Sequence, residues 1–242
     1  MKFSVVIPVH NEEQFLSLVL PSVFRLKPDD VVLLFDRCSD GSLKLAKDLS
    51  ARYHMLAVTQ FVLVDEPSDY RFRFAFLRNF GCSLARYNVV VVSAADLILD
   101  QKIRDYVGLI GKYGLISFEH KELNWRHMIK RLLARVLPFD WLGSVRVFDR
   151  RLLRFEDLDE LKTLESEDTH LADSIRPHAR TLYVMSNTVH LRPREDSLRH
   201  YRRGRLYAHY GRSFLLALGC TLCTLRFGLL KGYIHERFGQ VE

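Results

Sequence analysis

Hydrophobic and polar positions alternate along the first half of the chain in segments of two kinds. Short runs rich in Val, Ile, Leu and Phe predict buried strands, and stretches with a three-to-four-residue apolar period between them predict helices. The strands are expected at Phe3–Val9, Val31–Phe35, Met55–Val64, Asn88–Ala94 and Leu115–Phe118, and the helices at Glu13–Leu26, Ser42–Arg52, Phe74–Tyr87 and Gln101–Lys112. This alternation is typical of an α/β domain with a mostly parallel central sheet and helices on both faces.

The second half of the chain has a less regular pattern, with one further strand expected at Thr181–Val184. Asn124–Phe139 places apolar residues on one face and basic residues on the other, which is the profile of an interfacial helix. Ser213–Leu225 is apolar but has only thirteen residues, whereas a membrane-spanning helix needs about 20. We therefore expect a domain over residues 1–210 and a C-terminal helical appendage over residues 211–242.

The apolar helical segments indicate peripheral contact with a membrane, and packing on themselves or in a homodimer is the alternative. The N-terminus has only a few apolar residues before Glu12 and Glu13. That pattern does not match a secretory signal peptide, whose apolar core is longer. We expect a cytoplasmic protein that contacts the cytoplasmic face of the membrane.

Polar residues follow three of the predicted strands. His10, Asn11 and Glu12 follow the first strand, residues 36–42 (DRCSDGS) follow the second, and Asp96 and Asp100 follow the fourth. The carboxyl ends of parallel strands meet at one edge of a sheet, where such folds bind ligands. The sequence has neither G-x-G-x-x-G nor G-x-x-x-x-G-K-[ST], which excludes a dinucleotide fingerprint and a P-loop. An acidic crevice that binds phosphate requires a divalent cation between the two.

Basic residues are concentrated in one part of the chain. The formal net charge is +7, and residues 176–212 alone contain nine arginines and two acids, which equals that excess. Arginine favours bidentate recognition of phosphate or carboxylate, so this block predicts contact with anions. The interleaved tyrosines also fit RNA or anionic lipid. A hydrophobic content of 48% excludes a disordered chain.

Four segments in order resemble the motifs of family-2 glycosyltransferases with the GT-A fold. They are SVVIPVHNEEQFLSLVLPSV, VVLLFDRCSDGS, RNFGCSLARYNVVVVSAADLIL and ESEDTHLADSI, and together they span about 170 residues. The resemblance implies a GT-A-like sheet, a nucleotide-sugar donor and Mn²⁺ or Mg²⁺ as cofactor. The signature of processive polysaccharide synthases is missing, which favours transfer of a single sugar.

The resemblance assigns a nucleotide-binding role to five residues. Pro8, His10 and Glu12 would line the base and ribose, and Asp36 would accept a hydrogen bond from the base. Arg78 would reach the nucleotide or its diphosphate, and a solvated helix arginine is the alternative.

Two neighbours of Asp36 need separate comment. Arg37 stands where the family has glycine, so this turn departs from the usual pattern. Asp40 is interpreted as a cap of the following helix rather than as a ligand of the nucleotide.

The D-x-D motif of the family is incomplete in this chain. Ala94 replaces the first acid, and Asp96 retains the second, which implies that Asp96 ligates the metal. Asp100 is expected to cap the next helix rather than to replace the missing acid. His190 stands where several relatives have a further metal ligand, and a structural histidine is the alternative.

The resemblance also implies how the reaction proceeds. Asp168 would be the general base of an inverting transfer, within hydrogen-bond reach of the acceptor hydroxyl, and Glu167 is the reserve candidate that would orient the acceptor. The arginine block would neutralise the departing diphosphate or bind a lipid phosphate. Its candidate residues are Arg199, Arg202, Arg203 and Arg205.

The predicted function is transfer of one sugar from a nucleotide-sugar to a glycan hydroxyl or a lipid-linked acceptor. One alternative is a catalytically silent relative that binds anionic lipid or nucleic acid, which the missing acid at Ala94 supports. A second alternative is a sugar-phosphate nucleotidyltransferase, although that class has a Gly-rich basic loop after its first strand and this chain has none. Nucleic acid is the less expected partner.

Overall fold

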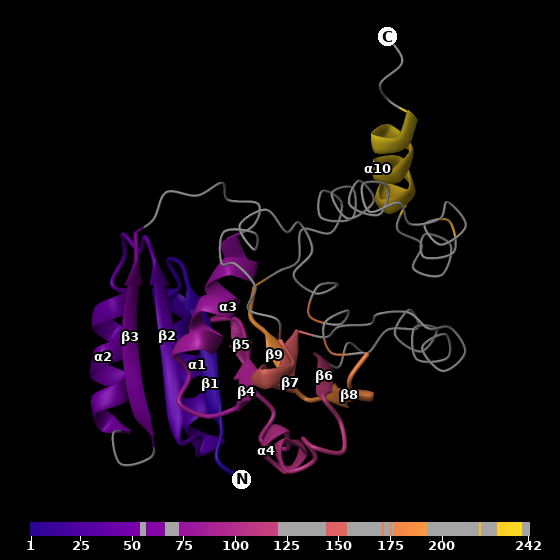
Figure 1. The fold of residues 1–242 in the computed structure, drawn as a ribbon. Helices are drawn as coiled ribbons and strands as arrows, with labels where there is room; N and C mark the ends of the chain where they lie inside the picture. The colour runs from indigo at the N-terminus through magenta and orange to yellow at the C-terminus, as the bar shows by residue number, and fades with distance from the viewer. Residues whose placement is uncertain are drawn as a thin grey trace. The chain divides into compact units, whose positions relative to one another are not determined.

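The central feature of the fold is a seven-stranded sheet. The computed structural model describes residues 1–53, 57–65, 73–120, 144–153, 177–192 and 227–238, together with Leu171, Ile175 and Leu218. The sheet has the strand order β3-β2-β1-β4-β7-β6-β8 (Figure 1). Its strands are β1 (Ser4–Val9), β2 (Asp30–Asp36), β3 (Val58–Val64), β4 (Val89–Val92), β6 (Leu115–His120), β7 (Val145–Asp149) and β8 (Thr181–Ser186). Two short strands, β5 (Leu97–Ile98) and β9 (Val189–His190), pair separately.

The pairing is mostly parallel, as predicted. β1 runs parallel to β2 and β4, β2 runs parallel to β3, and β6 runs parallel to β8. Only β7 is antiparallel to its neighbours in this sheet, β4 and β6. The hydrophobic pattern does not predict β7, because Arg146 interrupts its short apolar run, or β5 and β9, because two residues give no period. The predicted α/β class with a mostly parallel central sheet is confirmed.

The helices agree with the predicted positions except for one. Those whose bounds lie in the described residues are α1 (Glu13–Arg25), α2 (Ser42–Arg52), α3 (Arg73–Leu84), α4 (Ile103–Val107) and α10 (Phe227–Phe238), with a 3₁₀ turn, η1, at Arg150–Leu152. The helix expected over Gln101–Lys112 is limited to α4. Gly111 follows it in a positive-φ conformation (φ 110°) that a helix cannot continue through.

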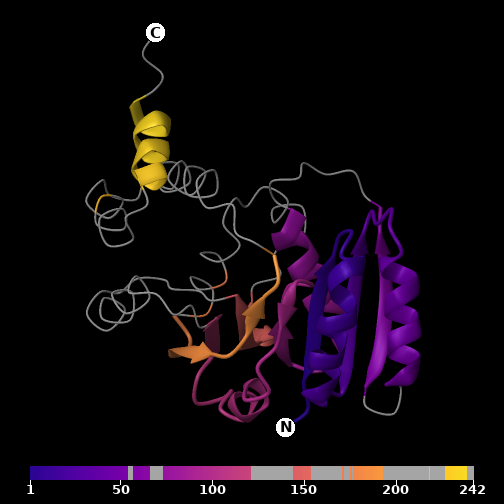
Figure 2. The same cartoon turned by 180° about the vertical axis from the view of Figure 1, so that it is seen from behind.

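Helices cover both faces of the sheet (Figures 1 and 2). On one face, α1 and α2 pack side by side, and their apolar residues bury Val5, Ile7 and Val9 of β1. On the other face, Val6 of β1 packs into the core that contains α3. Alternate residues of β1 point to opposite faces and both faces are covered, so the strand is apolar at nearly every position.

Helix α3 lies close against the sheet because of a glycine. A Cβ atom at Gly81 would lie 2.6 Å from Cδ1 of Leu34 and closer still to Cγ1 of Val6. Both neighbours are fully buried in the central strands β2 and β1. Gly81, which belongs to the R-N-x-G segment of the sequence, therefore sets the distance at which α3 packs.

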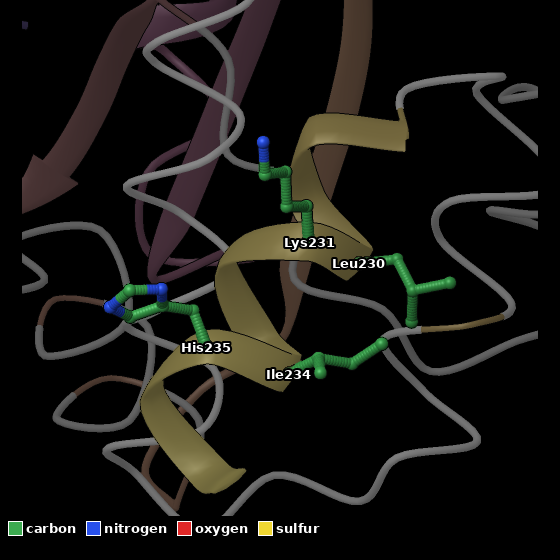
Figure 3. Close-up of a pocket in the computed structure, with 4 residues that line it drawn as sticks. All are labelled: Leu230, Lys231, Ile234 and His235. Atoms are coloured by element: carbon green, nitrogen blue, oxygen red, sulfur yellow. The ribbon is translucent and has the colours of Figure 1, made fainter. Parts of the chain in front are cut away.

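The chain divides into two compact units. One consists of Met1–Lys121 and Asp140–Arg192, and the other of Glu122–Phe139 and Pro193–Glu242. In the second unit the structure describes Leu218 and α10, whose Leu230, Lys231, Ile234 and His235 line a shallow hollow (Figure 3).

Most of the predicted C-terminal features lie outside the described residues. These are the helix at Asn124–Phe139 and all of residues 211–226 except Leu218, so the helical appendage and the boundary at residue 210 stay predictions. Within the described part of the chain, no helix combines the length and the apolar character that crossing a bilayer requires.

Candidate nucleotide and metal site

The carboxyl ends of β1, β2 and β4 bring the predicted site residues to one edge of the sheet. In the order β3-β2-β1-β4, consecutive strands lie on one side of β1 and the later strand β4 on the other, so the strand order reverses between β1 and β4. Ligands of parallel α/β sheets bind at such a reversal. Residues 10–12 follow β1 and Asp96 follows β4, so they flank this position.

Pro8 is buried near the end of β1. Its register partner on β2 is Leu34, while the pairing of β1 with β4 ends at Val6 and Val92. The missing backbone N–H of Pro8 therefore removes no hydrogen bond from the β1–β4 ladder. Proline is tolerated here because the two strands stop pairing two residues before it.

His10 and Asp36 connect the ends of β1 and β2. Nδ1 of His10 lies 2.6 Å from the backbone oxygen of Asp36, so this ring nitrogen donates to a carbonyl. The carboxylate of Asp36 is 3% exposed and accepts hydrogen bonds from Nε of Arg37 at 3.1 Å and Nε of Arg73 at 2.5 Å. Arg73 also donates to the backbone oxygen of Val64 at 3.3 Å. The predicted base-binding carboxylate is thus held by a buried arginine at the start of α3.

Sequence reasoning chose a different arginine of α3. Arg78 is fully buried, and its Nε donates to Oδ1 of Asn79 at 2.9 Å, so its predicted contact with the nucleotide stays a prediction. Arg73 carries no motif signal. Its position five residues before Arg78 on the same helix is the only hint that the sequence offers.

Two turns at this edge have left-handed backbone conformations. Asn11 has a φ of 52° and Arg37 a φ of 45°, a region that costs a residue with a Cβ atom free energy. This conformation explains why glycine is the usual residue at the position of Arg37. Oδ1 of Asn11 accepts a hydrogen bond from the backbone N–H of Ser39 at 2.8 Å, which fastens the two turns together.

Asp40 and Glu13 fasten the same turns from the other side. Asp40 accepts the backbone N–H of Ser42, at the start of α2, at 3.0 Å and that of Glu13 at 3.1 Å. Glu13 in return accepts the N–H of Gly41 at 2.8 Å. These bonds agree with the interpretation of Asp40 as a helix cap, and hydrogen bonding lowers its pKa against the opposing effect of burial.

The short pairing of β5 with β9 places His190 beside Asp96. Leu97 is the register partner of His190, and the backbone N–H of Leu191 donates to the backbone oxygen of Asp96 at 2.9 Å. Nε2 of His190 lies 3.7 Å from Oδ2 of Asp96, which is 8% exposed. Nδ1 of His190 lies 2.9 Å from the backbone oxygen of Arg192, so Nδ1 donates to this carbonyl and Nε2 is the ring nitrogen that faces Asp96.

Asp100 has a structural role, although it holds the turn before α4 rather than capping the helix, whose N-cap is Lys102. Its Oδ1 accepts the backbone N–H of Lys102 at 3.0 Å, and its Oδ2 accepts that of Asn187 at 2.7 Å. The backbone N–H of Asp100 donates to Oγ1 of Thr188 at 3.4 Å. Asp100 therefore anchors the turn between β8 and β9, which supports the position of His190.

Glu12 forms an ion pair that the sequence did not predict. Nη2 of Arg192 lies 2.6 Å from Oε1 and 2.7 Å from Oε2 of Glu12, and Nε of Arg192 lies 3.9 Å from Oδ2 of Asp96. Burial raises the pKa of Glu12, and the neighbouring Asp96 acts in the same direction, while Arg192 opposes both. Arg192 belongs to the arginine block, but only its place two residues after His190 distinguishes it there.

Asp96 and His190 fit a divalent cation that takes its other ligands from a diphosphate and water. One carboxylate oxygen and one imidazole nitrogen face each other, and Mg²⁺ and Mn²⁺ are commonly bound through one or two protein groups plus substrate phosphates. In the described ranges, no group of three or more His, Cys, Asp or Glu side chains could hold a metal. Ala94 supplies no side-chain ligand.

Several predicted residues lie outside the described part of the chain. These are Glu167, Asp168, Arg199, Arg202, Arg203 and Arg205, and their roles stay predictions.

Comparisons with known proteins identify the family of the chain. The family described as Glycosyl transferase family 2 matches residues 4–161. Among curated proteins, no sequence matches the chain.

Solved structures resemble the chain at low sequence identity. A mannosyltransferase, PcManGT, from Pyrobaculum calidifontis in complex with GDP-Man and Mn²⁺ has a TM-score of 0.73 at 15% identity, over 99% of this chain and 88% of that one. Glucosyl-3-phosphoglycerate synthase from Mycobacterium tuberculosis, with Mn²⁺, UDP and phosphoglyceric acid, has a TM-score of 0.56 at 18% identity, over 87% and 78%. S. aureus TarS 1–349 in complex with UDP-GlcNAc has a TM-score of 0.55 at 16% identity, over 91% and 72%.

The structural similarity supports the fold, and the match to the family model shows the family to which the chain belongs. The matched residues include β1, β2 and β4 with the polar turns that follow them, which carry the candidate residues His10, Asp36 and Asp96. The chain therefore belongs to glycosyl transferase family 2 and has the GT-A fold.

Proposed function

We propose that this glycosyltransferase transfers one sugar from a nucleotide-sugar donor to an acceptor hydroxyl or a lipid phosphate, with inversion and with Mn²⁺ or Mg²⁺ as cofactor. The observation that carries the proposal is the approach of His190 to within 3.7 Å of Asp96, beside Glu12, at the reversal of strand order. Solved GT-A neighbours crystallised with GDP-Man and Mn²⁺, or with UDP and Mg²⁺, support a metal-bound nucleotide donor.

The nucleotide would bind across the ends of β1 and β2. The Asp36 carboxylate is buried and fixed by Arg73, so it can select a base whose ring N–H donates toward it. His10 is held by its bond to the backbone of Asp36, which orients the ring at the same turn. A fixed carboxylate loses little entropy on binding, which favours recognition of one base over the others.

Asp96 and His190 would hold the cation at the donor's diphosphate. When bound, the cation neutralises the charge that develops on the leaving diphosphate. His190 presents Nε2 toward Asp96 because its Nδ1 proton is engaged by the carbonyl of Arg192. The backbone carbonyl of Arg192, just after β9, would thereby orient Nε2 toward the cation.

The acceptor side would be completed by residues of the C-terminal half. Asp168 would take the proton of the acceptor hydroxyl, Glu167 would orient the acceptor, and Arg199, Arg202, Arg203 and Arg205 would stabilise the departing diphosphate. A lipid-linked acceptor fits a protein attached to the cytoplasmic face of the membrane, and that location is part of the proposal. A phosphate acceptor would not need the base.

A catalytically silent relative is the second candidate, because Ala94 replaces the first acid of the D-x-D motif. Metal-dependent binding of a nucleotide would favour the enzyme, because a silent anion-binding module has no need for a metal-dependent diphosphate site.

The test is calorimetric titration of GDP, UDP, GDP-mannose and UDP-GlcNAc with and without Mn²⁺, on the wild type, Asp96→Asn and the control Asp48→Asn. We expect Mn²⁺-dependent binding of one nucleotide by the wild type, loss of that binding in Asp96→Asn, and retention of it in Asp48→Asn, which changes an exposed acid on α2. At 100 times its dissociation constant the bound nucleotide should stabilise the fold by about 2.7 kcal/mol. Binding by none of the four ligands, or equal binding by Asp96→Asn, would contradict the proposal.

A further inference from the structure

Arg192 occupies the space between the two acids of the site. Its Nη2 contacts both carboxylate oxygens of Glu12, and its Nε lies 3.9 Å from Oδ2 of Asp96. Its guanidinium also lies 5.8 Å from the ring centre of Phe15 on α1. The side chain of Arg192 is 51% exposed, whereas those of Glu12 and Asp96 are 11% and 12% exposed.

The two acids need a positive charge near them. Burial and Asp96 both disfavour the ionised form of Glu12, and Arg192 is the group that favours it most. In the state described here that charge is a guanidinium from this chain. A divalent cation bound at Asp96 would meet the same guanidinium at close range, and two positive charges at such a distance repel each other.

We propose that Arg192 is an internal cation that pairs with Glu12 and Asp96 until the donor arrives, and that its guanidinium then turns to the donor's diphosphate. The divalent metal alone then binds weakly, and metal and diphosphate bind cooperatively. The inference rests on the proposed function, because it takes the diphosphate and the metal as the ligands of this site.

The geometry permits this exchange without movement of the backbone. The backbone oxygen of Arg192 accepts the bond from His190, and the backbone N–H of Leu191 is bonded to Asp96, so the main chain of this segment is held. The side chain is half exposed, so a change of its rotamer would not require the core to open. A guanidinium forms bidentate bonds with phosphate as well as with carboxylate, so the diphosphate can replace Glu12 as its partner.

The test measures binding of the metal alone and of the nucleotide separately. Free Mn²⁺ is followed by electron paramagnetic resonance in the absence of nucleotide, and binding of GDP and UDP is followed by calorimetry at saturating Mn²⁺. The proteins are the wild type, Arg192→Met, Arg192→Lys and the control Arg180→Met, which removes an exposed arginine just before the N-terminal end of β8.

We expect Arg192→Met to bind Mn²⁺ alone about five-fold or more tightly, because coupling between sites is commonly of that size. We expect the same variant to bind the nucleotide at least about five-fold more weakly at saturating Mn²⁺. Arg180→Met should match the wild type in both measurements, and Arg192→Lys should retain most of the wild-type behaviour on Mn²⁺. Effects of opposite sign on the two ligands cannot arise from partial unfolding, which would weaken both.

Unchanged or weaker binding of Mn²⁺ by Arg192→Met, with normal nucleotide binding by the wild type, overturns this inference and leaves the proposed function intact. Failure of the wild type to bind either nucleotide in the presence of Mn²⁺ overturns the proposed function, and the inference with it.

Discussion

Substitution of Gly81 by alanine tests whether close packing of α3 stabilises the domain. The added Cβ would lie 2.6 Å from Cδ1 of Leu34 and closer still to Cγ1 of Val6, where carbon atoms prefer about 3.5–4.0 Å. Overpacking of this kind typically costs about 1–3 kcal/mol. Alanine recovers about 1 kcal/mol of helix propensity. Because Val6 and Leu34 are fully buried in central strands, we expect a cost in the upper part of that range and therefore a net loss of about 1–2 kcal/mol.

The assay is urea unfolding followed by far-ultraviolet circular dichroism, in which a lower midpoint at unchanged slope reports lower stability. The expected fall in melting temperature is roughly 2–8 °C for a domain of this size. Gly108→Ala is the control, since Gly108 has a φ of −64° and its Cβ would lie 3.4 Å from the backbone oxygen of Asp105. If Gly81→Ala unfolds at the same urea concentration as the wild type or a higher one, close packing at this glycine is not what fixes α3.

Three further measurements test other parts of the description. Arg37→Gly should raise the free energy of unfolding by about 0.5 kcal/mol in urea, because it relieves a left-handed conformation that costs about 1–2 kcal/mol and loses only a partly exposed bond to Asp36; lower stability would contradict this account. Asp168→Asn should slow transfer to a hydroxyl acceptor by about 10²–10⁴-fold and leave transfer to a phosphate acceptor nearly unchanged; a wild-type rate with the hydroxyl acceptor would exclude Asp168 as the base. Burial raises the pKa of Cys82 to about 12, so native wild type and Cys82→Ala should consume equal amounts of a thiol reagent at pH 8 and differ only in urea; a difference in the native state would show that the thiol is accessible.

The sequence predicted the elements whose hydrophobic pattern extends over several residues. Strands β1, β2 and β4 are apolar at nearly every position because both faces of the sheet are covered, and this pattern is visible without a structure. Strands β5 and β9 have two residues each, and their pairing depends on contacts between segments far apart in the sequence. Local pattern carries no information about such a pairing.

The site residues also divide into those that the local sequence pattern predicts and those that it does not. The positions of His10, Asp36 and Asp96 could be predicted because they lie at or just after the ends of β1, β2 and β4, and the position of a strand end determines where they lie. Arg73 and Arg192 could not be predicted, because an arginine on a helix or in a basic block looks the same whether it faces solvent or a carboxylate. Only the folded structure identifies them, because it shows Arg73 bonded to Asp36 and Arg192 bonded to Glu12.

Because the pairing of β5 with β9 is short, the affinity of the site for its ligand can change while the stability of the main sheet stays the same. A two-residue ladder, the bonds around Asp100 and the backbone bond from Leu191 to Asp96 hold the segment of His190 and Arg192 beside Asp96, whereas the main sheet is stabilised by a continuous core. A local opening of β9 would break up the site while the sheet remained folded. Apparent affinity falls in proportion to the fraction of molecules with the segment closed. Substitutions at Thr188 that loosen this turn should therefore weaken donor binding, speed hydrogen exchange at the Leu191 amide, and leave the urea midpoint of the sheet unchanged.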